Sequence, residues 1–509
     1  MRRMGMVLLA LLTALLTLVP PAPAAAAAGG RVLLLYDSLA AGTDKEGNVA
    51  ELQRLLAAYS SEVTLLSIDE YQTGQMDGYS RIITVMNNGD IETVNPQYAR
   101  DTANFQGQLL HIGYHVPEQL RKAMSLKTAV DPGTSASLSI GDIAGLAFQA
   151  SDMPYIVSFK GGRPYGSLSL EDGSLQAPFA VSAGRYTYVP YLQGDSGLLG
   201  LSYVLRDWFA VTDAPHTYLV LREIYPFSDL ELLEHAAERL YESGIPFVAS
   251  VRPVFGNTSF PAMERYAEAL RVVQSYNGSI VINAPAVRPP INSSDRSLAG
   301  KMSTFIDVLV NAGVAPLGIA AENYWTYDKE YAPAGMGFFD SVVLFPDEQI
   351  FYMEETNVSK SFASSLYSMT WEELTGLPHT GKALPQLPLD TAVTLELPEA
   401  EEELDAMLQS LQGSWMNFAD YRQGNHSVNT DNHTVVSSGG VISINGQTLN
   451  VAYSPQAVDG NYQYQEEQKV SFAKLFSVQS AFFIVVIIFA LLLFGALLLI
   501  GRRLYRKKY

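Results

Sequence analysis

The sequence predicts an α/β protein that begins with a parallel α/β domain carrying a β-rich extension, continues as a (β/α) barrel and ends in a single C-terminal transmembrane helix. Three patterns predict this fold class: a βαβ rhythm from Arg31, strand-then-helix units repeated over residues 216–424, and twenty successive uncharged residues from Ala481 to Ile500. A chain of 509 residues, 48% of them hydrophobic, is long enough for two or three domains.

Residues 1–28 have the pattern of a secretory signal peptide. Two arginines precede an apolar run from Met6 to Val19, and an alanine-rich stretch that suits a signal peptidase follows. We therefore expect the chain to be exported.

Residues 29–210 are predicted to form a flavodoxin-like α/β domain with a β-rich extension. "RVLLLYDS" is typical of a buried strand, "NVAELQRLLAAY" has the apolar spacing of a helix, and "EVTLLSI" and "RIITVMN" are typical of two more strands. From about Ser137 to Leu192 the apolar runs become short and alternate between glycines, as hairpins do. The first strand lacks a following GxGxxG pattern, so a nucleotide site is not favoured.

Residues 216–424 repeat strand-then-helix units, which favours a complete or partial barrel. Strands are expected at "YLVLREI", "IPFVASV", "SIVINAP", "APLGIAAE" and "TAVTLELP". For the first helix we expect Ser228 as the N-cap, Glu231 as its capping-box partner and Gly244 as the stop.

The C-terminal region predicts attachment to a membrane. Residues 425–475 are polar and alternating, as in a small juxtamembrane β stalk, and residues 478–500 are predicted to be the transmembrane helix. Residues 501–509 hold five cations and should stay in the cytoplasm. The expected location is the cell membrane, with a single pass, the ectodomain outside and the C-terminus cytoplasmic.

Composition restricts the partners. The chain has no cysteine, so an exported ectodomain must be stable without disulfides. Its formal net charge of −19 argues against nucleic acid as a partner, whereas cationic polymers, divalent ions or simple solubility are compatible with it.

Two phrases carry a family resemblance: "YLVLREIYPFSDLELLEHAAERLYESGIPFVASVRPVF" and "ALRVVQSYNGSIVINAPAV". They resemble the extracellular polysaccharide-deacetylase-like domains, which are related to the NodB-type carbohydrate esterases. The resemblance covers residues 216–424 and implies a barrel. It also implies a zinc site in active members, with two adjacent aspartates after the first barrel strand and two histidines four residues apart after the third.

Matched to that pattern, this chain lacks the catalytic set. The base position falls on Arg222 and the metal carboxylate on Glu223, while the histidine positions fall on Asn283 and Val287. A guanidinium cannot accept a proton and repels a dication, and an isopropyl group has no lone pair. Two later histidine positions of the family fall on Asn323 and Leu397, so the resemblance implies a degenerate member with no catalytic residue, no metal and no cofactor.

Without zinc, the barrel mouth would be lined by polar strand-end residues. The candidates for a ligand-binding cleft are Arg222, Glu223, Arg252, Asn283, Glu322 and Tyr324. Such a cleft could hold a sugar chain through hydrogen bonds and stacking. Alternatively, the charged members form an internal ion network that fills the place of the metal.

These observations lead to three hypotheses of function. The first is a membrane-anchored, non-catalytic protein that binds or scaffolds an extracellular polysaccharide of the cell envelope, with membrane-bound polysaccharide synthesis or export proteins as partners. The alternative is an active carbohydrate esterase or glycoside-active hydrolase that uses other residues, for example the acidic pair Asp340 and Asp347. The third is a structural protein without glycan affinity.

"HIGYH" (111–115) has the spacing of a metal-binding pair only on a helix, and the surrounding residues favour a strand end, where the two histidines would lie apart. His426 and His433 lie in a polar segment, and ordinary exposure is the simpler interpretation for both.

Overall fold

The structure, a computed structural model, describes residues 30–90, 95–170, 176–285, 297–348 and 356–453, together with Gly495. The chain divides into two compact units, Met1–Ser454 and Pro455–Tyr509. All helices and strands named below belong to the first unit.

An eight-stranded sheet forms the N-terminal part, with strand order β17-β2-β1-β3-β4-β11-β10-β7. The five strands from β2 to β11 in this order run parallel, whereas β10, β7 and β17 pair antiparallel. The strands are β1 (Arg31–Tyr36), β2 (Glu62–Ser67), β3 (Arg81–Met86), β4 (Gln108–Gly113), β7 (Arg163–Tyr165), β10 (Ala180–Ala183), β11 (Tyr186–Val189) and β17 (Thr356–Val358). The helices of this part are α2 (Asn48–Ala58), α3 (Pro96–Asn104), α4 (Glu118–Met124) and α5 (Gly194–Trp208).

A second, antiparallel sheet of four strands in the order β6-β5-β8-β9 corresponds to the glycine-punctuated segment of the sequence. Its strands are β5 (Lys127–Ile140), β6 (Ile143–Ser158), β8 (Ser167–Leu170) and β9 (Gln176–Ala177). Most of the paired residues of this sheet belong to the long β5–β6 hairpin.

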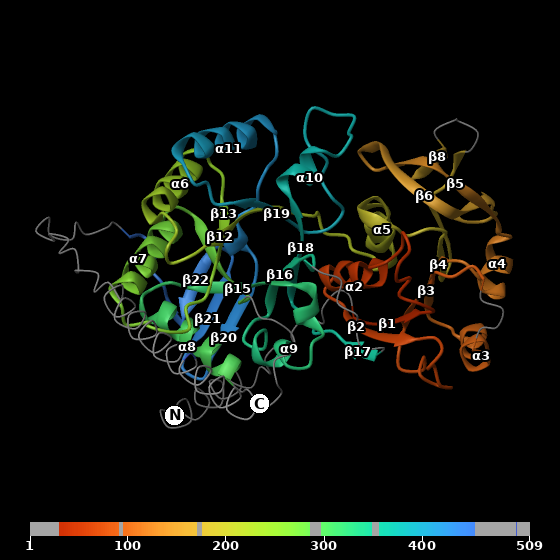
Figure 1. Cartoon of the computed structure of the whole chain (residues 1–509), viewed down its shortest axis with the longest axis horizontal. Coiled ribbons are helices and arrows are strands. Elements are labelled where there is room, and N and C mark those ends of the chain that lie inside the picture. The colour runs from red at the N-terminus through yellow and green to blue at the C-terminus, as the bar shows by residue number, and fades with distance from the viewer. Residues whose placement is uncertain are drawn as a thin grey trace, which may run out of the picture. The chain divides into compact units, whose positions relative to one another are not determined.

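Seven parallel strands close into a barrel in the order β12-β13-β14-β15-β16-β18-β19. Helices α6, α7 and α11 lie on its outside (Figure 1). Strand β13 is buried along its whole length, as strands covered on both faces are. The strands are β12 (Thr217–Ile224), β13 (Phe247–Val251), β14 (Gly278–Asn283), β15 (Pro316–Glu322), β16 (Ser341–Phe345), β18 (Ser364–Thr370) and β19 (Thr391–Glu396). The helices are α6 (Leu230–Glu242), α7 (Pro261–Ser275), α8 (Ser297–Asn311), η1 (Asn323–Thr326), α9 (Tyr331–Ala334), α10 (Trp371–Thr375), α11 (Glu401–Gly413) and η2 (Tyr421–Gln423).

The start of helix α6 differs from the sequence-based prediction by one residue. The N-cap is Asp229, whose carboxylate accepts a hydrogen bond from the Leu232 amide at 3.0 Å. The Ser228 hydroxyl instead accepts from the Tyr225 amide at 3.0 Å, which closes the turn before the helix. The predicted N-cap was wrong because serine and aspartate are both favourable N-cap residues. The Ser228 hydroxyl is already used by the preceding turn, so Asp229 caps the helix.

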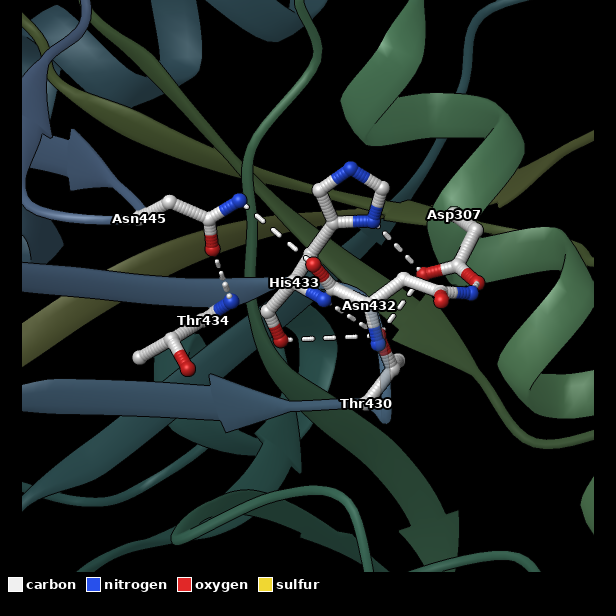
Figure 2. A network of polar contacts seen from close by, with 6 residues as sticks. All are labelled: Asp307, Thr430, Asn432, His433, Thr434 and Asn445. Carbon is white, nitrogen blue, oxygen red and sulfur yellow. Dashed lines mark hydrogen bonds and ion pairs between the residues drawn. The ribbon is translucent and has the colours of Figure 1, made fainter.

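A four-stranded antiparallel sheet follows the barrel, with strands β20 (His426–Asn429), β21 (Thr434–Ser438), β22 (Val441–Ile444) and β23 (Gln447–Thr448). It is fixed at the amino-terminal end of β16, where His426 Nδ1 lies 2.9 Å from Ser341 Oγ and the Ser427 amide donates to Asp340 at 2.7 Å. A further network joins its β20–β21 turn to Asp307 of helix α8 (Figure 2). The predicted juxtamembrane role of residues 425–475 stays a prediction.

The N-terminal sheet and the barrel are interlocked. Strand β17 follows β16 in the sequence but pairs with β2 at the edge of the N-terminal sheet (Figure 1). Gln53 Nε2 of helix α2 donates to Asn357 at 2.8 Å, and the Val63 amide donates to Ser359 Oγ at 3.0 Å. Because these contacts are buried, the two parts form one packed unit.

The predicted fold class is wrong in its last element. Throughout the described ranges, no helix is both long enough and apolar enough to cross a membrane. The longest helices named above have 15 residues, about 22 Å, which is less than a hydrocarbon core of about 30 Å. The predicted span at 478–500 lies outside the described residues except for Gly495, and the predicted signal peptide (1–28) and basic tail (501–509) lie outside them entirely. The structure shows a mixed α/β protein with several sheets and a closed seven-stranded barrel.

Candidate binding site at the barrel mouth

The six predicted site residues all lie at the carboxyl ends of barrel strands. Arg222 and Glu223 are near the end of β12, Arg252 follows β13, Asn283 ends β14, Glu322 ends β15, and Tyr324 lies in η1. Because all seven strands are parallel, these ends gather at one end of the barrel, which we term the mouth. Three of the six residues are in direct contact, namely Arg222, Glu223 and Arg252.

Glu223 is the centre of this contact. Its carboxylate accepts a hydrogen bond from Arg252 Nη2 at 2.9 Å and lies 3.7 Å from Arg222 Nη2, and the Tyr225 hydroxyl also donates to it. Burial raises the pKa of Glu223, but the hydrogen bonds from Tyr225 and Arg252 and the two positive charges outweigh burial and lower the pKa overall. The carboxylate is therefore ionised and already paired.

The backbone at Glu223 is strained. Its φ is 59°, in the left-handed region, and the pairing of β12 with β13 shifts register between Leu221 and Ile224. A non-glycine residue adopts this conformation only where its surroundings hold it, and a bulge of this kind turns a side chain to a new direction. At Glu223 the bulge brings the carboxylate within reach of both guanidinium groups.

The two arginines are fixed in different ways. The Arg222 guanidinium carbon lies 4.0 Å from the centroid of the Phe345 ring, and its buried Nε has no hydrogen-bond partner among the described residues. Arg252 Nη1 donates to the Ala284 carbonyl at 2.9 Å and so joins the ends of β13 and β14. The positions that the resemblance assigned to a base and a metal ligand thus hold an ion network.

The structure describes one of the two histidine positions of the resemblance. Asn283 is 3% exposed, and its side-chain nitrogen has no partner in the described part of the chain. Val287 lies outside the described residues. Within the described ranges there is no group of three or more histidine, cysteine, aspartate or glutamate residues that could hold a metal ion.

Two carboxyl groups have raised pKa values, namely Glu322 of the mouth and Asp347 beside it. Burial raises the pKa of Glu322 and outweighs the hydrogen bond from the Glu348 amide, which lowers it; the negative charge of Glu348 acts in the same direction as burial. The pKa of Asp347 is raised to about 7, mainly by burial, with Glu51 and Glu322 contributing, although a hydrogen bond from the Tyr324 amide at 2.9 Å opposes the rise. Asp347 thus joins the mouth through Tyr324.

Two exposed aromatic residues of the mouth, Phe227 and Phe260, were not predicted from the sequence. Phe227, in the turn between β12 and α6, is 82% exposed and stacks on Tyr225, with 4.8 Å between ring centroids and an interplanar angle of 19°. Phe260, just before α7, is 55% exposed. The sequence does contain a signal for these rings. Tyr225 and Phe227 are two residues apart in a polar turn, where both side chains cannot be buried in the core. The mouth therefore combines an ion network with exposed aromatic faces.

The acidic pair considered for an alternative enzyme is not brought together. Asp340 precedes β16 and accepts from the Ser427 amide at 2.7 Å, whereas Asp347 lies beyond the other end of the same strand. Seven residues along a strand correspond to about 23 Å, whereas the two carboxyl groups of a glycosidase lie about 5 to 10 Å apart. Asp340 and Asp347 therefore cannot act as one catalytic pair.

The histidines of the remaining candidate motifs are occupied by hydrogen bonds. His111 is buried, with Nδ1 2.6 Å from Thr84 Oγ1 and Nε2 2.6 Å from the Tyr114 carbonyl, and burial lowers its pKa to about 4. His115 lies 3.0 Å from the Asn88 carbonyl. His426 uses both ring nitrogens, toward Ser341 and the Tyr421 carbonyl.

Comparison with known proteins adds little. No protein-family model and no curated protein matches the sequence. Among solved structures, the chain is similar to a β-galactosidase from the psychrophilic Marinomonas ef1, with 16% sequence identity and a TM-score of 0.23. That match covers 36% of this chain and 29% of the β-galactosidase chain, less than a third of its length.

Proposed function

We propose that the barrel mouth binds a chain of an extracellular polysaccharide and does not cleave it. The observation that carries this proposal is the exposed ring of Phe227, which stacks on the ring of Tyr225. The Tyr225 hydroxyl in turn donates to the Glu223 carboxylate, which is paired with Arg252. Flat aromatic faces offer apolar contact to sugar rings, and fixed charged groups beside them offer hydrogen bonds to hydroxyls. Tyr225 contacts both kinds of group, because its ring stacks on Phe227 and its hydroxyl donates to Glu223.

The contacts of Glu223 argue against deacetylation at this site. A zinc esterase needs protein ligands for the metal and a free carboxylate that takes a proton from its water. Here the carboxylate of Glu223 is held by Arg252 and Tyr225, and Arg222 adds a second positive charge. We expect purified protein to release no acetate from acetylated aminosugar polymers and to hold no stoichiometric zinc.

A second candidate function, a glycoside-active hydrolase, is favoured by one observation. Glu223 has a lowered pKa, whereas Glu322 at the end of β15 has a raised pKa. Both lie at the carboxyl ends of barrel strands, and their opposite pKa shifts match the protonation states that an acid and a base or nucleophile require. Formation of new reducing ends, lost on Glu322→Gln, would favour this enzyme over the binding protein.

The binding proposal is tested by affinity electrophoresis and a glycan array. Phe227→Ala should weaken polysaccharide binding about 3- to 10-fold, the usual value of an aromatic contact, without changing the melting temperature. Tyr241→Ala is a matched control, because Tyr241 is 54% exposed on the outer helix α6. An Arg222→Ala, Tyr324→Ala double variant tests the polar part of the mouth. Absence of glycan affinity in the unmodified protein would favour the purely structural role instead.

A further inference from the structure

A second hollow lies between the N-terminal sheet and the barrel, away from the six mouth residues. It is a pocket of about 460 Å³ that lies against helices α2, α5 and α10 and strand β18. This volume falls in the range of small-molecule sites. Its apolar wall consists of Leu55, Leu146, Leu198, Leu199, Met369, Leu377, Leu387 and Leu389.

The charged groups at this pocket are mostly acidic. Glu51, Asp195, Glu372 and Glu373 line it, and Arg54 is the one cationic residue among the described lining residues. Glu51 is paired with Arg54 at 2.8 Å, and Glu373 accepts from the Thr370 amide at 2.6 Å. The side-chain carboxylates of Asp195 and Glu372 make no hydrogen bond or ion pair with any other described residue, and both residues are exposed.

Arg54 is not available to an anionic ligand. Its guanidinium already donates to Glu51 at 2.8 Å, to the Tyr367 hydroxyl at 2.6 Å, and to the carbonyls of Ser368 and Leu344 at 3.1 and 3.4 Å. An anion would therefore face the carboxylates of Asp195 and Glu372, while the one guanidinium of the described lining is already occupied. A neutral ligand would form no ion pair with these two carboxylates.

The acidic character continues into a neighbouring pocket. This smaller hollow of about 160 Å³ shares Glu51, Asp195 and Leu198 with the first and adds two acidic residues, Glu46 and Asp347. The described lining of this smaller pocket includes no lysine or arginine. The two pockets thus share an acidic lining at Glu51 and Asp195.

We propose that the 460 Å³ pocket binds a small amphipathic organic cation, with its apolar part against the leucines and its ammonium group between Asp195 and Glu372. The leucine wall supplies burial of apolar surface, and the two carboxylates supply the preference for positive charge. The described lining of this pocket includes none of the six mouth residues, and the proposal does not depend on the proposed polysaccharide function.

The test uses the full chain and three probes of equal chain length: n-hexylammonium, hexanol and hexanoate. Isothermal titration calorimetry should show binding of hexylammonium that is at least about 5-fold tighter than that of hexanol, with no binding of hexanoate. An Asp195→Asn, Glu372→Gln double variant should remove the preference for the ammonium over the alcohol and keep the weak apolar binding.

Two variants locate the site. Leu198→Ala should weaken the binding of both hexylammonium and hexanol, since Leu198 is part of the wall. Glu402→Gln is the control, because Glu402 is an exposed carboxylate of helix α11, outside the described lining. Equal binding of the three probes, no binding of hexylammonium, or a preference for ammonium that survives in the double variant would each overturn the proposal.

Discussion

Arg54 of helix α2 donates to the hydroxyl of Tyr367 in barrel strand β18 at 2.6 Å, and its guanidinium carbon lies 4.0 Å from the centroid of the same ring. Arg54 is 4% exposed, and its other donors reach Glu51 and two carbonyls of the barrel. One side chain from the N-terminal part therefore satisfies groups on both sides of the junction. Such a contact stabilises the junction only while the charge stays paired.

Replacing Arg54 tests how strongly this junction contributes to stability. Arg54→Met should lower the free energy of unfolding by about 3 kcal/mol or more, because Glu51 and the barrel carbonyls lose their donor. Tyr367→Phe removes one hydrogen bond and should cost only about 1 kcal/mol. Urea unfolding measures both. Near-equal stability of Arg54→Met and the unmodified protein would mean that the junction contributes little.

A pair of substitutions at Glu223 separates backbone strain from charge pairing. Both Glu223→Ala and Glu223→Gly remove the carboxylate that pairs with Arg252, so both should destabilise the protein. The glycine variant should be more stable than the alanine variant by about 1 kcal/mol, because a φ of 59° is unfavourable for alanine and allowed for glycine. Thermal unfolding of the two variants in parallel checks this order, and an alanine variant at least as stable as glycine would contradict the strain.

Much of the barrel could be predicted from the sequence, and the reasons are local. Phe247–Val251 is an apolar run because both faces of the strand are buried, and Gly244 after helix α6 has a φ of 69°, which suits a stop. Strand β17 could not be predicted, since three residues from the barrel segment pair with a strand that lies nearly three hundred residues earlier. Contacts of that range leave no periodic pattern in the sequence.

The site could be predicted in part. The six mouth residues lie at or just beyond strand ends, as the strand-then-helix order implies, but their partners depend on geometry. The bulge at Glu223 and the stacking of Phe227 on Tyr225 arise from tertiary packing, which propensities do not encode. The predicted transmembrane helix rested on hydropathy alone, and no described helix meets the length it requires.

Asp347 should make stability depend on pH in the neutral range. Its folded pKa, about 7, lies above the value of an unfolded aspartate, about 4, so its favourable contribution is fully present below pH 4 and is lost as pH rises from there through about 7. Asp347→Asn keeps an acceptor for the Tyr324 amide and removes the charge. The variant should therefore gain about 1 kcal/mol or more relative to the unmodified protein at pH 8 and gain little at pH 4. Denaturant unfolding at both pH values measures this, and a gain independent of pH would rule out titration of Asp347 as its cause.

Asp307 should make stability depend on pH with the opposite sign. Its carboxylate accepts from Thr430 at 2.7 Å and from Asn432 at 2.6 Å and lies 2.8 Å from His433 Nδ1, as Figure 2 shows. Burial raises the pKa of Asp307, but these hydrogen bonds outweigh burial and lower the pKa overall. A lowered folded pKa gives stability that is present above the unfolded pKa, about 4, and is lost as pH falls through the folded value.

Asp307→Asn should therefore destabilise the protein by about 1 to 3 kcal/mol at pH 7, and the difference from the unmodified protein should shrink below pH 4. The sheet β20–β23 should loosen first, because Asp307 of α8 joins the β20–β21 turn to the barrel, and hydrogen exchange of the Val435 and Val436 amides reports this loosening.

Asp405→Asn is the matched control, since the Asp405 side chain is 63% exposed in its ion pair with Arg239 and should change stability by less than about 1 kcal/mol. Faster exchange confined to β20–β23 would locate the effect at this contact, whereas uniform faster exchange would mean that Asp307 stabilises the whole unit.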